Sequence, residues 1–290
     1  MHVFVTGATG WVGSAVVAEL IAHGHAVTGL TRSAEKAPAL AASGATVLSG
    51  TLDDHDILRD AAAAADAVIH TAFNHDFSKF ADNAAQDVRA IETLGQALEG
   101  SDRPLLVTSG LPAVPDDAVA FETDIPGPIG PRRSEQTARS LAERGIHVAT
   151  VRLPPSVHGI GDYGFVPMLI NIARQTGVSA YIGDGQNKWS SVHRLDAAKV
   201  YRLALETGVR QAAYHPVDDA GVPLKDIATL IGKHLGLPVE SRTREHFTWF
   251  ADFAGHNRAA SSALTREWLN WTPTETSLLS DLDNPAYYAA

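Results

Sequence analysis

Near one end the chain reads Val3-Phe4-Val5-Thr6-Gly7-Ala8-Thr9-Gly10-Trp11-Val12-Gly13. Its first three residues form an apolar run typical of a buried strand, and residues 11–21 carry apolar side chains at helical spacing. We expect Gly7 to allow a tight turn between the two, Gly10 to let a ligand approach the backbone, and Gly13 to let the helix pack closely on the strand. The unpaired N–H groups and the positive dipole end of the helix would then face that ligand. The stretch therefore predicts a pyrophosphate site where the helix begins.

Short apolar runs alternate with helical patterns through the first half of the chain. After the first strand, the predicted strands are residues 25–30, 46–48, 67–71, 105–109 and 147–153. The clearest helices between them are residues 77–99 and 134–144, which carry their apolar side chains on one stripe. This alternation predicts an α/β fold, with a doubly wound parallel Rossmann sheet that is covered on both faces.

The second half of the chain lacks this clear alternation and predicts a smaller, mostly C-terminal substrate lobe. We expect residues 1–155 to form the dinucleotide-binding domain, with residues 188–215 returning to it. Residues 156–187 and 216–290 are then expected to form the lobe. The aromatic residues of the last segment, Trp249 and Trp271 among them, are expected in the core of that lobe.

The composition argues against several kinds of binding partner. Acidic residues outnumber basic ones by 33 to 23, and the net charge of −10 argues against nucleic acid or an anionic membrane surface. The chain has no cysteine, which excludes disulfides and thiolate chemistry, and no histidine pair has the spacing of a helix-borne zinc site. No apolar run reaches membrane-spanning length, and no leader pattern precedes the first strand. We therefore expect a cytoplasmic protein that binds no metal.

The glycine spacing Gly7-x-x-Gly10-x-x-Gly13, inside Thr-Gly-Ala-Thr-Gly-Trp-Val-Gly, resembles the short-chain dehydrogenase/reductase superfamily, and specifically its extended and atypical branches. The resemblance runs along most of the chain and implies an NAD(P)-binding fold and an oxidoreductase. The cofactor contacts that it assigns to the turn are Thr6, Gly7, Thr9, Gly10, Trp11, Val12 and Gly13.

The end of the second predicted strand bears on the choice of cofactor. An acidic residue about 20 positions beyond the glycines would hydrogen-bond the ribose 2′-hydroxyl of NAD. Here the chain reads Thr31-Arg32-Ser33, and the planar fork of an arginine suits a 2′-phosphate. These residues favour NADP(H) over NAD(H), unless Arg32 is simply a solvated loop cation.

The resemblance implies further cofactor contacts after later strands. They are Leu52, Thr71, Ala72, Phe73, Pro154 and Ser156. Leu52 would cover the adenine ring, and residues 71–73 would pass beneath the nicotinamide ribose. Residues 154–159 match a junction that covers the nicotinamide and leads into the lobe. His70, just before residues 71–73, is expected to be structural.

The catalytic positions of the family match this chain only in part. Ser109, at the end of the fifth predicted strand, stands where the family's serine hydrogen-bonds the substrate carbonyl. The family then has Tyr-x-x-x-Lys, where this chain has Ile129 and Arg133. Ile129 cannot transfer a proton, whereas Arg133 can hold ribose hydroxyls or a substrate oxygen as a fixed cation. We predict Ser109 and Arg133 as the catalytic residues, unless Arg132 and Arg133 are only solvated charges before a helix.

These residues predict an NADP(H)-dependent oxidoreductase that acts on a small carbonyl or alcohol, without the usual tyrosine proton relay. The proton would come from water or from His75, Tyr163 or His158. Two alternatives remain open: a non-catalytic NADP(H)-binding redox sensor, and a lyase or isomerase that uses tightly bound cofactor. The interface of the extended family also implies a homodimer built on the helices 77–99 and 134–144.

Overall fold

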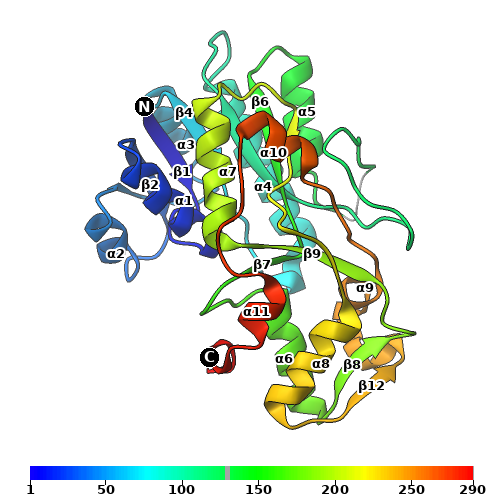
Figure 1. Ribbon diagram of the computed structural model, residues 1–290. Helices are drawn as coiled ribbons and strands as arrows, with labels where there is room; N and C mark the ends of the chain where they lie inside the picture. The colour runs from blue at the N-terminus through cyan, green and yellow to red at the C-terminus, as the bar shows by residue number, and fades with distance from the viewer. Residues whose placement is uncertain (128–130, 290) are drawn as a thin grey trace.

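The computed structural model describes residues 1–127 and 131–289, and its larger unit is built on a parallel sheet of seven strands (Figure 1). The strands lie in the order β10-β6-β5-β4-β1-β2-β3. Their bounds are β1 His2–Thr6, β2 Ala26–Thr31, β3 Thr46–Ser49, β4 Ala67–His70, β5 Leu105–Gly110, β6 Val148–Leu153 and β10 Ala213–Tyr214. The strand order reverses between β1 and β4, which is where doubly wound sheets bind their ligands.

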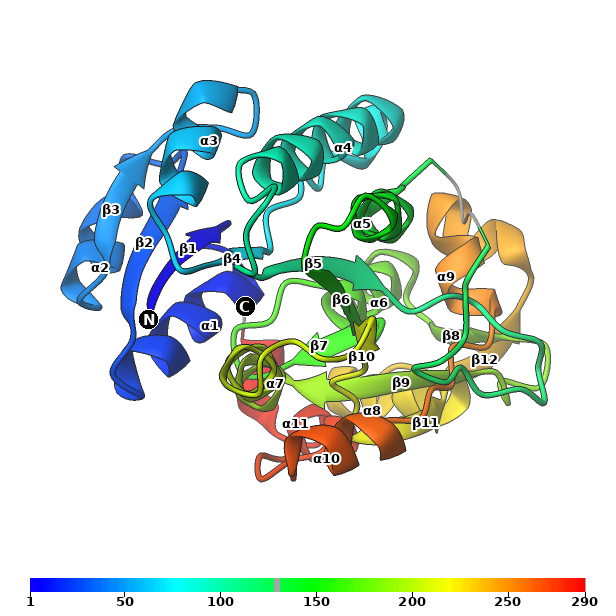
Figure 2. The same cartoon turned by 90° about the horizontal axis from the view of Figure 1, so that it is seen from above.

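Helices cover both faces of this sheet (Figure 2). One face carries α1 Trp11–Ala22, α2 Ala37–Ala42 and α7 Arg194–Glu206, and the other carries α3 His55–Ala63, α4 Phe80–Gln96 and α5 Ser134–Glu143. Strand β1 is buried on both sides, because Val3 and Val5 join the apolar cluster of α1 and α7 whereas Phe4 joins that of α3, α4 and α5. The predicted doubly wound Rossmann sheet is therefore confirmed.

The observed elements match the predicted ones closely, with one difference at a helix start. The five later strands lie within one residue of their predicted bounds. The helix predicted at 77–99 is shorter at both ends, since the 3₁₀ turn η1 Phe77–Lys79 precedes α4. The Asp76 carboxylate accepts hydrogen bonds from the backbone N–H of Ser78 (3.1 Å) and from its hydroxyl (2.5 Å), which holds this turn. Apolar periodicity does not reveal such a cap.

The smaller lobe contains two further sheets and an apolar core of its own. β11 Asp219–Pro223, β9 Lys188–His193 and β7 Ser156–His158 form one sheet, and β8 Ser179–Ile182 pairs with β12 Val239–Arg242 in the other. The helices around them are α6 Phe165–Thr176, α8 Leu224–Leu235, η2 Arg244–Phe250, α9 Ala251–Gly255, α11 Leu278–Leu282 and η3 Pro285–Tyr288. Trp189, Phe247 and Phe250 lie at the centre of this core.

Two segments of the chain are shared between the larger unit and the lobe. Within residues 188–215, β9 pairs with β7 and β11, whereas α7 packs on α1 and β10 pairs with β6. Helix α10 Ala263–Leu269 packs on α7, and Trp271 behind it joins the core of the larger unit. Trp249 is 56% exposed. The expectation that these two tryptophans lie in the lobe core is therefore wrong: Trp249 lies in η2 of the lobe but at its surface, and the chain leaves the lobe at α10, before Trp271.

Candidate functional site

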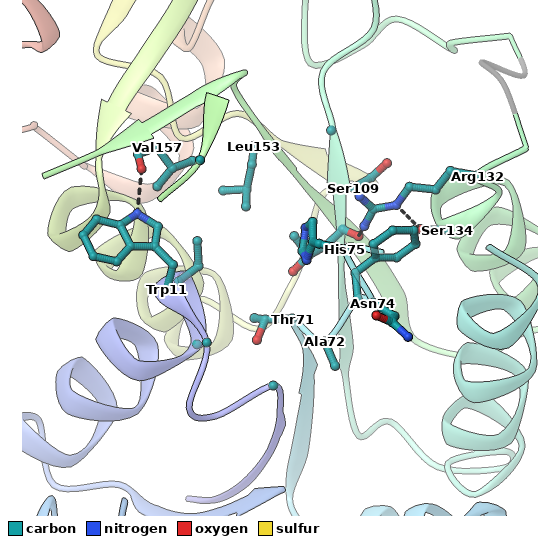
Figure 3. A pocket seen from close by; sticks show the side chains of 18 of the residues that line it. Trp11, Thr71, Ala72, Asn74, His75, Ser109, Arg132, Ser134, Leu153 and Val157 are labelled. Atoms are coloured by element: carbon teal, nitrogen blue, oxygen red, sulfur yellow. Dashed lines mark hydrogen bonds between the residues drawn. The ribbon is translucent and has the colours of Figure 1, made fainter. Parts of the chain in front are cut away.

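An open cleft runs along the carboxyl ends of the strands, where the sheet meets the lobe (Figure 3). Its volume is about 1520 Å³, larger than the roughly 300–1,000 Å³ typical of pockets for drug-sized ligands. Lobe residues line the other side, among them Phe165, Met168 and Phe253. The cleft lies at the reversal of strand order and has room for a dinucleotide together with a second molecule.

The glycine turn lies at one end of the cleft and has the geometry that the spacing predicts. Gly7 has a φ of +67°, and a Cβ atom there would lie 2.7 Å from the backbone nitrogen of Ala72. A Cβ atom on Gly13 would lie 2.1 Å from the Gly7 carbonyl oxygen, so only glycine permits this approach of the helix. Gly10 is the N-cap of α1, and no side chain caps the helix. The first N–H groups of α1 are therefore left to bind an anion.

Trp11, the first residue of α1, joins the glycine turn to the lobe. Its indole Nε1 donates a hydrogen bond to the carbonyl of Val157 in β7 (2.6 Å). The ring of Tyr163 meets it edge-on at 5.7 Å, and the guanidinium of Arg194 lies 4.3 Å from its centre. Trp11 and Val12 both line the cleft. The indole therefore fixes the lobe against the start of the helix that would hold a pyrophosphate.

The end of β2 presents cations to the cleft. Thr31 is buried, and its hydroxyl lies 3.1 Å from that of Thr9 and accepts the backbone N–H of Ser33 (3.2 Å). Arg32 is exposed and lines the cleft, as does Lys36, which the sequence reading missed. None of the described residues 30–52 that line the cleft is acidic. This end of the cleft is suited to a phosphate.

Some of the predicted cofactor contacts at the later strands line the cleft, and others are buried away from it. Those that line the cleft are Leu52, Thr71, Ala72, Phe73 and Pro154. The Thr71 hydroxyl donates to the carbonyl of Thr6 (2.7 Å), which draws the end of β4 against β1. The Thr6 side chain itself points away to the ring of His70 (2.8 Å). Ser156 is 2% exposed and lies outside the lining.

Three polar side chains meet at the centre of the cleft. Ser109, at the end of β5, faces His75 and Arg132 across a short space (Figure 3). The Arg132 guanidinium lies 4.2 Å from the centre of the Phe73 ring and donates to the carbonyl of Thr108 (3.1 Å). Burial lowers the pKa of His75, and the positive charge of Arg132 lowers it further. The imidazole is therefore neutral near pH 7, beside a fixed cation.

A buried hydrogen-bonded chain holds Arg132 from behind. Its Nε donates to the Ser134 hydroxyl (2.8 Å), and that hydroxyl donates to the Asp87 carboxylate (2.5 Å). The other oxygen of Asp87 accepts from His70 Nε2 (3.0 Å), and the His70 Nδ1 meets Thr6. Burial raises the pKa of Asp87, but the hydrogen bond and charge of His70, with the charge of Arg132, bring it below its ordinary value. His70 is thus a structural histidine, as expected, and Asp87 is the buried counter-charge of Arg132.

The predicted catalytic cation, Arg133, lies one residue beyond Arg132. Arg133 is the N-cap of α5, lines the cleft and donates to the carbonyl of Arg132 (3.2 Å). Ile129, the residue at the usual tyrosine position, falls outside the described residues. From the sequence, Arg132 is expected only as a possible solvated charge, yet its guanidinium is the one that lies over the Phe73 ring next to Ser109 (Figure 3). The run Pro131-Arg132-Arg133 holds no local signal that separates the two arginines.

The three candidate proton donors have different surroundings. His75 lines the cleft beside Ser109. Tyr163 also lines it, but its ring packs on Trp11 and is 61% exposed. His158 is fully buried outside the lining, where its Nδ1 pairs with the Asp281 carboxylate (2.7 Å). The positions therefore favour His75 as a proton donor over the other two.

Residues 1–127 and 131–289 contain neither a metal site nor a membrane-spanning helix. No group of three or more His, Cys, Asp or Glu residues there is arranged to hold a metal ion. None of the helices there combines the length and apolar character that crossing a bilayer requires.

The chain is similar to known proteins over most of its length. The model of the NAD dependent epimerase/dehydratase family matches residues 3–217. A protein of Schizosaccharomyces pombe described as uncharacterized is 46% identical, over 99% of this chain and 100% of its own length. The 2-alkyl-3-oxoalkanoate reductase of Stenotrophomonas maltophilia is 28% identical, over 82% of this chain and 77% of its own length.

The fold is similar to that of solved structures as well. The UDP-glucose 4-epimerase of Thermus thermophilus, in a complex with NAD, has a TM-score of 0.76 to this chain. The match covers 100% of this chain and 99% of that protein at 18% identity. A likeness at this identity concerns the arrangement of sheet and lobe and does not extend to the substrate.

Proposed function

The chain belongs to the NAD dependent epimerase/dehydratase family, and from this premise we propose that it is an NADP(H)-dependent oxidoreductase acting on a small carbonyl or alcohol. Membership of this family bears out the resemblance to extended short-chain dehydrogenases and implies a nicotinamide dinucleotide as cofactor. The observation that carries the proposal is the convergence of Ser109, His75 and Arg132 on one cleft, beside a glycine turn with an uncapped helix N-terminus. The 28% identity to a 3-oxoalkanoate reductase supports a ketone substrate.

The cleft residues fit a dinucleotide along its whole length. The N–H groups at the start of α1 would hold the pyrophosphate, and Leu52 would cover the adenine. Arg32, Ser33 and Lys36 would hold a 2′-phosphate, which is why we propose NADP(H) over NAD(H). Gly110 supports the fit at the other end, because a Cβ atom there would meet no atom within 4 Å and would project into open space.

When bound, the nicotinamide supplies or accepts a hydride, and the protein handles the oxygen and its proton. The Ser109 hydroxyl would donate a hydrogen bond to the substrate oxygen. The Arg132 guanidinium, kept charged and held by Ser134, would stabilise negative charge that develops on that oxygen. Arg133 would hold ribose hydroxyls from the start of α5, as the family's lysine does.

We propose His75 as the residue that moves the proton, through a ring nitrogen. Its lowered pKa makes the neutral ring the main form near pH 7, which suits proton removal from an alcohol. In the direction of reduction the protonated ring is required, so reduction should be fastest below the ordinary histidine pKa of about 6.5. Replacement of His75 by Gln should remove this pH dependence, whereas Tyr163→Phe should keep it.

The test is NADPH oxidation, followed by absorbance with a panel of 3-oxo acids, their esters and simple ketones. The expected result is turnover that Ser109→Ala reduces about 10- to 100-fold, the scale of a lost hydrogen bond to a charged group. Deuterium transfer from labelled NADPH to the product carbon would identify hydride transfer itself. NADPH binding without turnover on any member of the panel would refute the enzyme and favour the redox sensor.

A further inference from the structure

Arg258 is a buried cation at the lobe side of the cleft, and the proposed function gives it no role. The residue is 9% exposed and lines the cleft. Its backbone N–H donates to the carbonyl of Lys188 (2.7 Å), and its carbonyl accepts from the N–H (3.1 Å) and the hydroxyl (2.8 Å) of Ser190. Strand β9 therefore fixes the backbone from which this side chain enters the cleft.

The guanidinium of Arg258 has few partners for a buried charge. One Nη donates to the carbonyl of Leu111 (3.2 Å), and the group lies 5.0 Å from the centre of the Phe253 ring. Its Nε is buried without a hydrogen-bond partner. Across residues 1–127 and 131–289, no carboxylate forms an ion pair with it; Asp252, the acid whose charge it feels, is already paired with Arg244. The guanidinium therefore keeps an unbalanced charge and unused donors.

Arg152 shows how this chain treats a buried arginine with a structural role. Arg152 is 3% exposed, and its Nε and Nη2 donate to the two oxygens of Glu135 (2.9 and 2.6 Å). Three backbone carbonyls and the ring of His215 take its other donors. Burying a cation without such a partner is strongly unfavourable. The contrast indicates that the partner of Arg258 comes from outside the chain.

The position of Arg258 relates it to the reacting carbonyl. Leu111, its hydrogen-bond partner, is two residues beyond Ser109 in the chain. Two residues of extended chain span at most about 7 Å, so one small molecule can reach both side chains. Phe165 and Phe253, whose ring centres are 4.3 Å apart, give the cleft an apolar wall on this side.

We propose that Arg258 binds a carboxylate of the substrate, so that the protein acts on an oxo acid, or the corresponding hydroxy acid, with an apolar chain. The claim that an oxo acid is reduced rests on the proposed function, whereas the claim that Arg258 binds a carboxylate does not. A planar guanidinium matches a carboxylate in a bidentate pair. One buried cation balances the single charge of a carboxylate, whereas a phosphate monoester carries about −1.5 to −2 and would leave an excess.

The first test measures binding without turnover. Octanoate is titrated calorimetrically into NADP⁺-saturated protein, with octanamide as the neutral probe of the same shape. Arg258→Met should weaken octanoate binding about tenfold or more, the loss expected of a charge-assisted pair, and leave octanamide and NADPH binding within about twofold. Arg266→Met is the matched control, because Arg266 also lies over an aromatic ring, Trp271 at 5.4 Å, but outside the cleft lining.

Stability separates ligand binding from a structural role. Because no carboxylate among the described residues pairs with Arg258, Arg258→Met should keep or raise the melting temperature, whereas replacing a structural arginine would lower it. Arg258→Lys keeps the charge without the fork, and it should bind octanoate with an intermediate affinity. Should the Met variant fail to fold, the Lys variant decides, and parental affinity for octanoate in it would contradict the bidentate pairing.

Several results would overturn the proposal. Equal octanoate affinity in the parent and in Arg258→Met would do so, and so would octyl phosphate binding more tightly than octanoate through Arg258. Failure of the proposed function looks different: no ketone is reduced, yet octanoate binding still depends on Arg258. If neutral ketones are reduced but the octanoate affinity of Arg258→Met equals that of the parent, the proposed function is supported and the carboxylate site is refuted.

Discussion

Replacement of Arg32 by alanine should weaken the binding of NADPH and leave that of NADH unchanged. Arg32 is exposed at the end of β2, where Thr31 is turned inward to Thr9 and offers a 2′-hydroxyl no acidic acceptor. The next two cleft residues along the chain, Ser33 and Lys36, add a hydroxyl and a second positive charge. A 2′-phosphate on the adenosine ribose would meet these groups, whereas NADH has only an uncharged hydroxyl at that position.

The magnitude follows from the exposure of the side chain. A hydrogen bond to a charged group contributes about 1.5–3 kcal/mol, and solvent and salt reduce the effect for an exposed arginine to roughly 1–2 kcal/mol. This corresponds to a loss of about 5- to 30-fold in NADPH affinity. Since Lys36 remains, some preference for NADPH should persist in Arg32→Ala and disappear in the double variant with Lys36→Ala.

The assay is calorimetric titration of each protein with NADPH and with NADH at two salt concentrations. The loss caused by Arg32→Ala should shrink at high salt, because the screening length falls from about 10 Å at 0.1 M to about 3 Å at 1 M. Arg59→Ala is the control, since Arg59 is exposed and pairs with Asp56 on α3, outside the cleft lining. Tighter binding of NADH than NADPH by the parent, or an equal loss for both cofactors, would refute the reasoning.

Three further predictions concern the cations of the cleft, the pH dependence of stability and the oligomer. Arg133→Ala should lower cofactor binding or turnover about tenfold or more, the scale of a lost charge-assisted bond, and parental values for both would contradict its role. Burial lowers the pKa of His215 to about 4, so the folded chain binds fewer protons than the unfolded chain between pH 4 and 6.5. The free energy of unfolding in urea should therefore rise with pH across this window, by roughly 3 kcal/mol at most, and a curve that stays as steep in His215→Gln would exclude this residue as the cause. Light scattering at micromolar concentration should give twice the chain mass of 30.7 kDa, because α4 leaves the small residues Ala81 and Ala85 exposed for a second copy; a monomer mass would end the homodimer hypothesis.

The larger unit could be predicted because its signals are local. Each strand and the helix after it are consecutive in the chain, and the apolar residues of β1 show that both of its faces are buried. The lobe could not be predicted in the same way. Other elements, first α6 with β8 and then α7 with β10, stand between its strands β7, β9 and β11 in the chain, and a three-residue strand such as β7 carries no periodicity. Only the packing of the whole chain brings them together.

The glycine turn was predictable for the same local reason, whereas the choice between Arg132 and Arg133 was not. Arg132 and Arg133 both precede the first residue of α5, so helical periodicity does not show which of them faces Phe73. That choice is set by Ser134, whose hydroxyl links Arg132 to the buried Asp87 on α4. Asp87 lies 47 residues earlier in the chain than Ser134, and no spacing rule relates the two.

The place of Arg258 is even harder to predict from the sequence. Its hydrogen-bond partner Leu111 is 147 residues away, and its backbone is held by β9, a strand that also pairs with β7 and β11. In the sequence it is one of many arginines. In the folded chain Arg152 pairs with Glu135 and its other donors are taken, whereas Arg258 leaves its Nε without a hydrogen-bond partner. A buried charge must be balanced: Glu135 balances Arg152, whereas none of the described carboxylates pairs with Arg258, which lies beside the proposed position of the reacting carbonyl. The carboxylate of a substrate would therefore take the place beside Arg258 that Glu135 has beside Arg152. Only a comparison of the partners of the two buried arginines reveals this difference.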